Sequence, residues 1–263
     1  MSDTDTRDPQ SFVRALARGL AVIEVMGGEE RGLSLSEVAA RCDLDRATAR
    51  RLLLTLIELG FVRSDGNRFH LTPRVLALGY AYLSSFPFWE VARPLMARLV
   101  EDVHESCSAA TQDGPYAIYV ARVRRTQRIV DVSRTVGSRI PAYCTSLGRV
   151  LLAALPVSEQ RRLLEELPRP QATRFTVTDV KALLDVLEAV REEGCSLIDQ
   201  ELELGLKSIA VPVLGERHQV IAALNISVQG GELSVQELRE RYLQPLRKTA
   251  SEISQAFMAR SVR

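Results

Sequence analysis

The segment from Ser34 to Val62, SLSEVAARCDLDRATARRLLLTLIELGFV, contains two short helical patterns separated by a tight turn. Ser36 is expected to cap the first helix, which extends through Arg41, and the letters CDL form the turn. Asp45 is expected to cap the second helix. The apolar residues of that helix recur at i, i+3, i+4 and i+7, and they are Ala49, Leu52, Leu53 and Leu56.

A further helix precedes this segment and a hairpin follows it. Apolar residues recur at helical spacing from Phe12 to Ile23, with Ser11 placed as the N-cap. After the segment, a turn at Asp65-Gly66-Asn67 separates two short apolar runs, which predicts a β-hairpin. Three short helices followed by a hairpin indicate a winged helix-turn-helix domain.

Basic residues in this region form a candidate DNA-binding set. In a helix-turn-helix the second helix enters the major groove, and donors near its amino end contact bases and phosphates. Arg46 and Arg50 are one turn apart, and positive charge at a helix amino end is otherwise unfavourable by about 0.3–1 kcal/mol. Arginines on a helix more often form a solvated surface, but the preceding helix, the tight turn and the basic hairpin together favour DNA. The predicted contacts are Ser36, Arg46, Ala47, Thr48, Arg50, Arg51, Arg63 and Arg68.

Composition bounds the class of protein without deciding its function. The 263 residues suit two domains, and the net charge of +1 means that DNA binding has to come from local placement of basic side chains. The four cysteines are scattered and only three histidines are present, so we expect no metal site and no cofactor. The polar amino end and the lack of a long apolar run predict a cytoplasmic protein with no membrane partner.

The rest of the chain changes from short helices to a mixture of helices and strands. Pro73 opens a helix with apolar residues almost all round it, which is equally consistent with a dimer contact and with packing inside the chain. From Phe88 onward, strands, a helical middle, more strands and a terminal helix predict an α+β domain with a mainly antiparallel sheet. The predicted division is a DNA-binding domain over 10–72, a linker helix over 73–87 and a second domain over 88–263.

Several runs resemble the IclR family of bacterial transcriptional regulators. They are RALARGLAVIEVM, the Ser34–Val62 segment, DGNRFHLTPRVLALG, VGSRIPAYCTSLGRVLLAALP, DQELELGLKSIAVPV and VIAALNISV. The nearest branch by resemblance is that of regulators of protocatechuate and β-ketoadipate catabolism. The resemblance implies a GAF-like effector-binding domain, a dimerising linker helix, and assembly as a homodimer or a homotetramer. It also implies an effector pocket lined by Ile129, Val132, Ser146, Leu147, Leu206, Ser208, Asn225 and Ser227.

The chemistry of these positions suits a small organic acid, because a buried anion requires donors in a cavity that is otherwise apolar. Ser146 lies where a strand gives way to a helix, whose amide groups can hold an anion, and Tyr143 and Thr145 add hydroxyls. Arg134 is a candidate partner for the carboxylate, with a surface position as the alternative. Asn225 and Ser227 share one face of a strand, and the alternative is that this face meets solvent.

The favoured function is a ligand-responsive regulator that binds palindromic double-stranded promoter DNA, with RNA polymerase as a further candidate partner. An enzyme with Cys144, Ser146 or Ser208 as nucleophile is disfavoured, because no G-x-S-x-G motif or evident base accompanies them. A third reading is an architectural DNA-binding protein whose second domain only oligomerises. The sequence leaves open the effector, the operator, the sign of regulation and the choice between two and four subunits.

Overall fold

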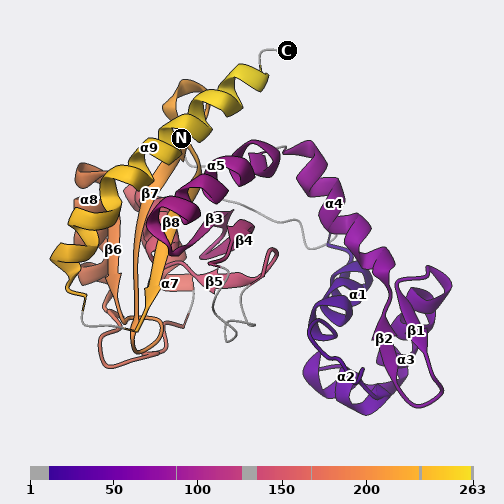
Figure 1. Cartoon of the computed structure of the whole chain (residues 1–263). Helices are drawn as coiled ribbons and strands as arrows, with labels where there is room; N and C mark the ends of the chain where they lie inside the picture. The colour runs from indigo at the N-terminus through magenta and orange to yellow at the C-terminus, as the bar shows by residue number, and fades with distance from the viewer. Residues whose placement is uncertain (1–11, 87, 126–134, 167, 231–232, 262–263) are drawn as a thin grey trace, which may run out of the picture. The chain divides into compact units, whose positions relative to one another are not determined.

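The computed structural model describes residues 12–86, 88–125, 135–166, 168–230 and 233–261. The chain divides into two compact units, the first ending at Ser84 and the second beginning at Ser85. Figure 1 labels most of the helices and strands of both units. Each unit has a hydrophobic core of its own, and the division falls inside the 73–87 segment.

The first unit consists of three helices and a two-stranded hairpin (Figure 1). Its helices are α1 (Arg14–Val25), α2 (Leu35–Arg41) and α3 (Arg46–Glu58), and its strands are β1 (Val62–Ser64) and β2 (Phe69–Leu71). Their common core contains Val22, Met26, Leu33, Val38, Ala39, Ala49, Leu53, Leu56 and Val62. The predicted winged helix-turn-helix is therefore confirmed, and the predicted inward face of α3 is buried except for the half-buried Leu52.

The structure corrects the predicted start of α2, because Ser34 and not Ser36 is its N-cap. The Ser34 hydroxyl accepts a hydrogen bond from the Glu37 amide at 3.3 Å, and the Glu37 carboxylate accepts one from the Ser34 amide at 2.7 Å. This reciprocal pair requires Glu three residues after the cap, a spacing that Ser34 has and Ser36 lacks. The predicted cap of α3 is confirmed, since Asp45 accepts from the Thr48 amide at 2.8 Å.

The hairpin has the predicted turn, with Ser64 opposite Phe69 in an antiparallel pair. Asp65 accepts a hydrogen bond from the Arg68 amide at 2.9 Å, and Gly66 has φ +101°, which side-chain-bearing residues rarely adopt. The turn chemistry of the sequence and the observed geometry agree.

The segment after the hairpin begins with a 3₁₀ turn, η1 (Pro73–Val75), and continues as α4 (Leu76–Ser85). The Thr72 side chain caps this turn by accepting from the Arg74 amide. No side chain of α4 is buried, and Leu76 and Tyr80 are 74% and 69% exposed.

The second unit is built on a six-stranded antiparallel sheet with the order β5-β4-β3-β8-β7-β6. The strands are β3 (Ser106–Asp113), β4 (Tyr116–Val123), β5 (Arg139–Pro141), β6 (Ser196–Asp199), β7 (Leu206–Leu214) and β8 (Val220–Gln229). Strands β3 and β8 are far apart in the sequence yet adjacent at the centre of the sheet. This confirms the predicted α+β class with an antiparallel sheet.

Helices cover both faces of this sheet (Figure 1). On one face lie α5 (Phe88–Val103) and α9 (Val235–Ser261), packed on residues such as Ile209, Leu224 and Ile226. On the other face lies α6 (Ser146–Ala153), which packs on Ala110, Ala210 and Ala223. Behind it lie α7 (Val157–Glu166) and α8 (Val180–Glu193), whose leucines complete the second core. The short turn η2 (Glu216–His218) joins β7 to β8.

Some local features of the helices and strands differ from the predictions or fall outside the described residues. Thr178 is the cap that the sequence predicts for α8, but Asp179 is the observed one, because its carboxylate accepts from the Ala182 amide at 2.8 Å. The short strand β5 was not predicted, since three residues give no readable alternation. The run RIVDVSRT, which the sequence also predicts to be a strand, lies outside the described residues apart from Thr135. Ser11 lies outside them as well, and Val13 occupies the N-cap position of α1, so the predicted cap was wrong.

Candidate DNA-binding surface and effector site

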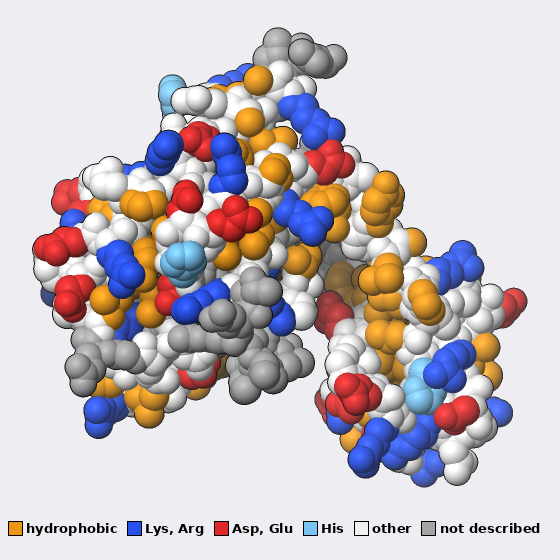
Figure 2. All heavy atoms as spheres, viewed as in Figure 1, with side chains coloured by type: hydrophobic (Ala, Val, Ile, Leu, Met, Phe, Trp, Pro, Cys, Tyr) orange, Lys and Arg blue, Asp and Glu red, His pale blue; other side chains and the backbone are white. Residues whose placement is uncertain are grey.

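The recognition helix α3 places its arginines outward because its apolar face is anchored in the core. Arg46, Arg50 and Arg51 are exposed, while Ala49 and Leu53 beneath them are fully buried. None of the three guanidinium groups makes a hydrogen bond or an ion pair within the described part of the chain. Their positive charge is therefore available to an anionic partner, and Figure 2 shows basic side chains gathered at this end of the first unit.

A groove of 630 Å³ lies between the start of α2, one flank of α3 and the hairpin. Ser36, Arg46 and Arg50 line it together with Asn67 and Arg68 from the hairpin. Five of these positions come from three separate elements, and both polar and charged groups face the groove. A phosphate-bearing strand or a base edge is the kind of ligand that such donors recognise.

Thr48 and Arg51 lie on the opposite flank of α3, so the predicted set is divided between two surfaces. They line a second groove of 540 Å³ between α1 and α3, whose walls are mostly apolar and include Leu16 and Leu59. Ala47 is exposed at the amino end of the helix. The side chains on the flank with Arg46 and Arg50 are thus better placed to act together with the hairpin.

The two hairpin arginines differ in their surroundings. Arg63 is exposed on β1, and its guanidinium group has no hydrogen bond or ion pair to any described residue. The Arg68 guanidinium donates to the Gly32 carbonyl oxygen at 2.7 Å and lies 3.5 Å from the Glu37 carboxylate. Arg68 therefore ties the hairpin to the start of α2, and Arg63 presents its charge outward.

In the second unit, one row of directly opposite residues crosses five strands on the face that packs against α6. From β4 to β6 the row contains Arg122, Ser108, Asn225, Ala210 and Ser196. A neighbouring row, displaced by two residues, contains Ser106, Ser227 and Ser208. Directly opposite side chains share a face, so these polar groups form a patch next to the apolar contacts of α6.

Two predicted pocket residues have buried atoms that lack a hydrogen-bond partner. They are Asn225, 4% exposed, through Oδ1, and Ser146, 1% exposed, through its hydroxyl. Buried polar atoms are nearly always hydrogen-bonded in folded proteins. Two buried atoms without a partner therefore indicate a place where a ligand can bind. The alternative that Asn225 faces solvent is contradicted by its burial, whereas Ser227 is half-buried.

The turn into α6 brings the other predicted hydroxyls together but satisfies them internally. Tyr143 donates to the Pro170 carbonyl at 2.6 Å, and Thr145 caps α6 by accepting from the Gly148 amide at 3.2 Å. A Cβ on Gly148 would overlap the backbone of Ala142, so only glycine allows this close approach. Of the predicted groups here, Ser146 alone keeps an unused polar atom.

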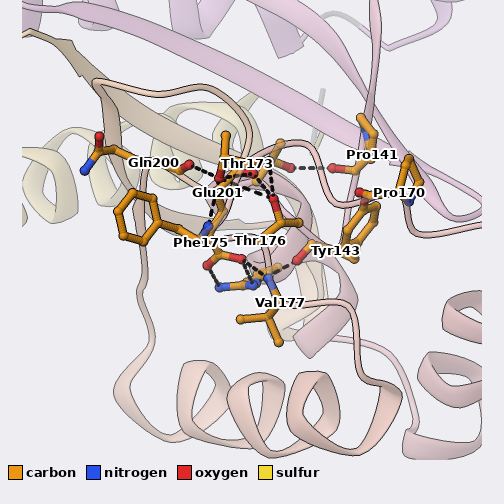
Figure 3. Close-up of polar contacts among 11 residues, drawn as sticks. Pro141, Tyr143, Pro170, Thr173, Phe175, Thr176, Val177, Gln200 and Glu201 are labelled. Carbon is orange, nitrogen blue, oxygen red and sulfur yellow. Dashed lines mark hydrogen bonds and ion pairs between the residues drawn. The ribbon is translucent and has the colours of Figure 1, made fainter.

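Sequence reasoning missed a buried ion pair just behind this turn (Figure 3). Arg149 donates to both carboxylate oxygens of Glu201 at 2.6 Å, and its Nε donates to the Tyr143 carbonyl at 2.8 Å. The Val177 amide donates to Glu201 at 3.0 Å, and the Thr176 hydroxyl donates to the Glu201 carbonyl at 2.6 Å. A charge inside the apolar run SLGRVLLA was the available signal.

Of the remaining predicted positions, Leu147 is buried in the core under α6. Leu206 and Ser208 lie on β7. Ile129, Val132 and Arg134 lie outside the described residues. Arg122, which was not predicted, brings a guanidinium to the polar row and lies 6.0 Å from the centre of the Tyr119 ring.

Nothing described in this region resembles an activated nucleophile. Burial raises the pKa of the Cys144 thiol to about 11, so it carries its proton at neutral pH. Among the described residues no three His, Cys, Asp or Glu side chains come together as metal ligands. Arg149 and Glu201 neutralise each other and contact the backbone, an arrangement that positions the chain around α6.

Comparison with known proteins decides the family. The model of the IclR helix-turn-helix domain matches residues 15–66, and that of the bacterial transcriptional regulator IclR C-terminal domain matches residues 80–255. The chain belongs to the IclR family. Its members are bacterial transcriptional regulators, so this chain is a DNA-binding transcriptional regulator.

Individual relatives of this IclR-family chain cover nearly its whole length. The Pca regulon regulatory protein of Pseudomonas putida is 42% identical over 90% of this chain and 81% of that protein. A crystal structure of a candidate transcriptional regulator from Rhodococcus sp. RHA1 is 46% identical, with a TM-score of 0.79 and coverage of 96% and 100%. An IclR homolog from Microbacterium hydrocarbonoxydans, solved with 4-hydroxybenzoate, is 25% identical, with a TM-score of 0.77 and coverage of 93% and 99%.

Proposed function

We propose that this IclR-family regulator binds double-stranded promoter DNA through α3 and the hairpin, and that an organic acid from aromatic catabolism controls it. The exposed, unneutralised charge of Arg46 and Arg50 beside the hairpin supports the first part. Both arginines can donate to guanine edges or phosphates from one flank of the helix. We place the DNA contacts on the groove side, with Ser36, Ala47 and Arg63 at its borders.

Selection of duplexes from a random pool by the full chain tests the DNA-binding part. We expect an inverted repeat to be enriched, because two copies of α3 related by a two-fold axis contact successive major-groove faces. Binding to the enriched duplex should weaken with salt, with a log–log slope of about −0.9 for each phosphate neutralised. Recovery of no preferred sequence at modest salt would overturn the proposal.

We propose a homodimer, or a dimer of dimers, as the unit that reads such a repeat. Exposed apolar side chains on α1 and α4, including Leu16, Leu20, Leu76 and Tyr80, support an association surface, since large apolar patches are rare on monomers. Sedimentation of the purified chain measures the assembly. A monomer at micromolar concentration would contradict the proposal, and the expected two-fold symmetric operator would then have no physical basis.

The effector part of the proposal is carried by two unsatisfied buried atoms, one on Asn225 in the sheet face under α6 and one on Ser146 at the start of α6. A relative that regulates a Pca regulon and a homolog solved with 4-hydroxybenzoate support an aromatic acid. The alternative is another small carboxylate such as glyoxylate. Thermal shift of the full chain against protocatechuate, 4-hydroxybenzoate, β-ketoadipate and glyoxylate tests both, and no response to any of them favours a purely architectural second unit.

Several coarser predictions accompany this proposal. We propose that the chain is not an enzyme, needs no cofactor or metal and acts in the cytoplasm, with RNA polymerase as a partner at the promoter. No helix within the described ranges has both the length and the apolar character needed to cross a bilayer. Assays for ester or acid turnover by the purified chain test the enzymatic alternative.

A further inference from the structure

We propose that Arg68 is a positioning residue for DNA recognition, which holds the hairpin against the start of α2 and thereby sets the groove beside α3. The inference rests on the proposed binding of DNA through α3 and the hairpin. It gives Arg68 a different task from Arg63, although the sequence predicts a DNA contact for both. Arg63 is exposed to solvent, whereas the guanidinium of Arg68 bonds to its own chain.

The hairpin has little of its own to fix its orientation. Its two strands are three residues long, and every residue from Arg63 to Asn67 is exposed. A two-stranded hairpin by itself is only marginally stable in water. Among the described residues, Arg68 is the first after the turn whose side chain bonds to a residue outside the hairpin. The orientation of the turn therefore depends on what Arg68 contacts.

Arg68 contacts the segment that leads into α2. Its Nη1 donates to the Gly32 carbonyl oxygen at 2.7 Å and lies 3.5 Å from the Glu37 carboxylate. The same carboxylate accepts a hydrogen bond from the Ser34 amide in the capping box. A single carboxylate therefore connects the first turn of α2 with the hairpin.

Gly32 delivers its carbonyl oxygen to Arg68 by a close approach of two backbones. Leu33 and Phe69 exchange backbone hydrogen bonds of 3.0 and 2.8 Å, which place this segment alongside β2. Gly32 has φ +65°, and a Cβ there would lie 2.6 Å from the Phe69 carbonyl oxygen. Only glycine fits this position, so the backbone itself fixes the acceptor that Arg68 uses.

The turn of the hairpin is held together from inside. Asp65 accepts from the Arg68 amide at 2.9 Å, and its other carboxylate oxygen lies 3.0 Å from Nε2 of His70. These contacts shape the turn but do not orient it, because both partners belong to the hairpin. Asn67 at the tip lines the groove together with the arginines of α3. The contacts of Arg68 with α2 therefore set how far this tip stands from the recognition helix.

A positioning role and a phosphate contact predict different losses when Arg68 is removed. A hairpin that is fixed before binding avoids the entropic cost of being ordered on the DNA. Its loss should reduce the preference for the operator, whose bases have to meet α3 and the hairpin at one spacing. Loss of a phosphate contact instead weakens all duplexes alike and lowers the salt slope by about 0.9.

Fluorescence anisotropy of the full chain with the selected operator and a scrambled duplex, each over a salt series, separates these patterns. We expect Arg68→Ala to lower the ratio of the two affinities about fivefold, the effect of losing one hydrogen bond, with the salt slope unchanged. A salt slope lower by about 0.9, or an unchanged affinity ratio, would overturn the inference.

Arg41→Ala is the matched control. Arg41, the last residue of α2, also binds one carboxylate, that of Glu29, and one backbone carbonyl, that of Val25. It removes the same charge from the same unit but does not hold the hairpin, so we expect the affinity ratio to stay as in the unaltered chain. An equal fall of the ratio in Arg41→Ala would show a general loss of stability and contradict the role of Arg68.

A second variant removes the partner of the arginine and serves if Arg68→Ala fails to fold. Glu37→Gln keeps the capping box, since glutamine also serves in that position, but removes the charge that faces Arg68. Loss of a negative charge beside DNA by itself strengthens binding to both duplexes and leaves their ratio unchanged. We expect the ratio to fall about twofold, as for an exposed ion pair. A ratio that stays constant or rises would contradict the proposal.

The same measurements separate this inference from the function on which it rests. If the unaltered chain prefers no duplex over any other, the proposed DNA-binding function fails. If it prefers the operator and Arg68→Ala keeps that preference, the positioning role of Arg68 fails, and DNA binding through α3 stands.

Discussion

Arg149 and Glu201 form a two-pronged ion pair in the interior of the second unit, although 52 residues separate them in the sequence. Through Arg149 the pair holds the Tyr143 carbonyl at the turn into α6, and through Glu201 it holds the Val177 amide (Figure 3). Glu201 also precedes β7, which carries Ser208. The pair thus joins the two segments from which the proposed effector site is built.

Breaking this pair from one side is expected to destabilise the second unit strongly. Arg149→Met or Glu201→Gln leaves a buried charge alone, which typically costs about 3–5 kcal/mol. The double variant Arg149→Met with Glu201→Met should recover much of this loss, since apolar replacement of a whole buried pair is often close to neutral. Urea unfolding followed by the fluorescence of Trp89 measures the second unit.

The matched control for that experiment is an exposed pair on α7. Arg162 binds the Glu159 carboxylate at 2.6 Å on the protein surface. Surface pairs contribute about 0–1 kcal/mol, so Arg162→Met should barely move the urea midpoint. Losses of the same size for Arg149→Met and Arg162→Met would contradict a special role for the buried pair.

The capping box at α2 predicts a second difference between similar substitutions. Ser34→Ala removes the hydroxyl that accepts from the Glu37 amide, and loss of such a cap costs about 1 kcal/mol. Ser36→Ala, two residues away and exposed, should leave helix stability nearly unchanged. Amide hydrogen exchange across α2 distinguishes them, with faster exchange expected only in the first variant.

The sequence predicted those parts of the fold that depend on local spacing. The apolar repeat of α3, the Asp45 cap, the hairpin turn and most strands of the sheet follow from residues near one another in the chain. The choice between Ser34 and Ser36 depended on a glutamate three residues away and was missed. The spacing of Ser34 and Glu37 is the signal in the sequence that identifies Ser34 as the cap.

The candidate effector site shows why other features escape sequence reasoning. The row from Arg122 through Ser108 to Asn225 exists only once β3 has been placed between β4 and β8, and strand order is a long-range property. The Arg149–Glu201 pair is likewise invisible before the fold is known. A polar residue in an apolar run, such as Arg149 or Asn225, signals burial with a partner but does not identify the partner.

Acid is expected to unfold the first unit through two carboxylates. Hydrogen bonds from the Thr48 and Ser34 amides lower the pKa values of Asp45 and Glu37 below their usual range. A lowered folded-state pKa contributes stability above the unfolded value, near pH 4, and that contribution is lost as the pH falls through the folded value. Asp45→Asn, which keeps an acceptor but cannot titrate, should flatten this part of an acid titration followed by circular dichroism.

Gly148 provides a test of how tightly the turn into α6 is packed. A methyl group there would overlap the backbone of Ala142, so Gly148→Ala forces the turn and the start of α6 apart. Overpacking of this kind costs about 1–3 kcal/mol or more, and effector binding should weaken as well. Gly79→Ala is the control, since nothing lies within 4 Å of the added carbon and alanine favours a helix by up to about 1 kcal/mol.

The division of basic residues between the two flanks of α3 leads to a prediction about DNA affinity. Arg50→Ala should weaken binding to the selected operator at least tenfold, because each good bidentate contact with a base contributes about 1–3 kcal/mol. Arg51→Ala, on the flank that faces the apolar groove with Leu16, should weaken it less. Arg63→Ala should weaken binding to specific and non-specific duplexes alike and reduce the salt slope by about one unit if it neutralises a phosphate.

Fluorescence anisotropy with the operator and a scrambled duplex measures the affinities of all three variants, with Arg161→Ala on α7 as a control that should leave every affinity unchanged. Equal losses of operator affinity for Arg50→Ala and Arg51→Ala would show that the two flanks of α3 do not differ. That result would contradict the proposal that the groove between α3 and the hairpin is the DNA contact surface.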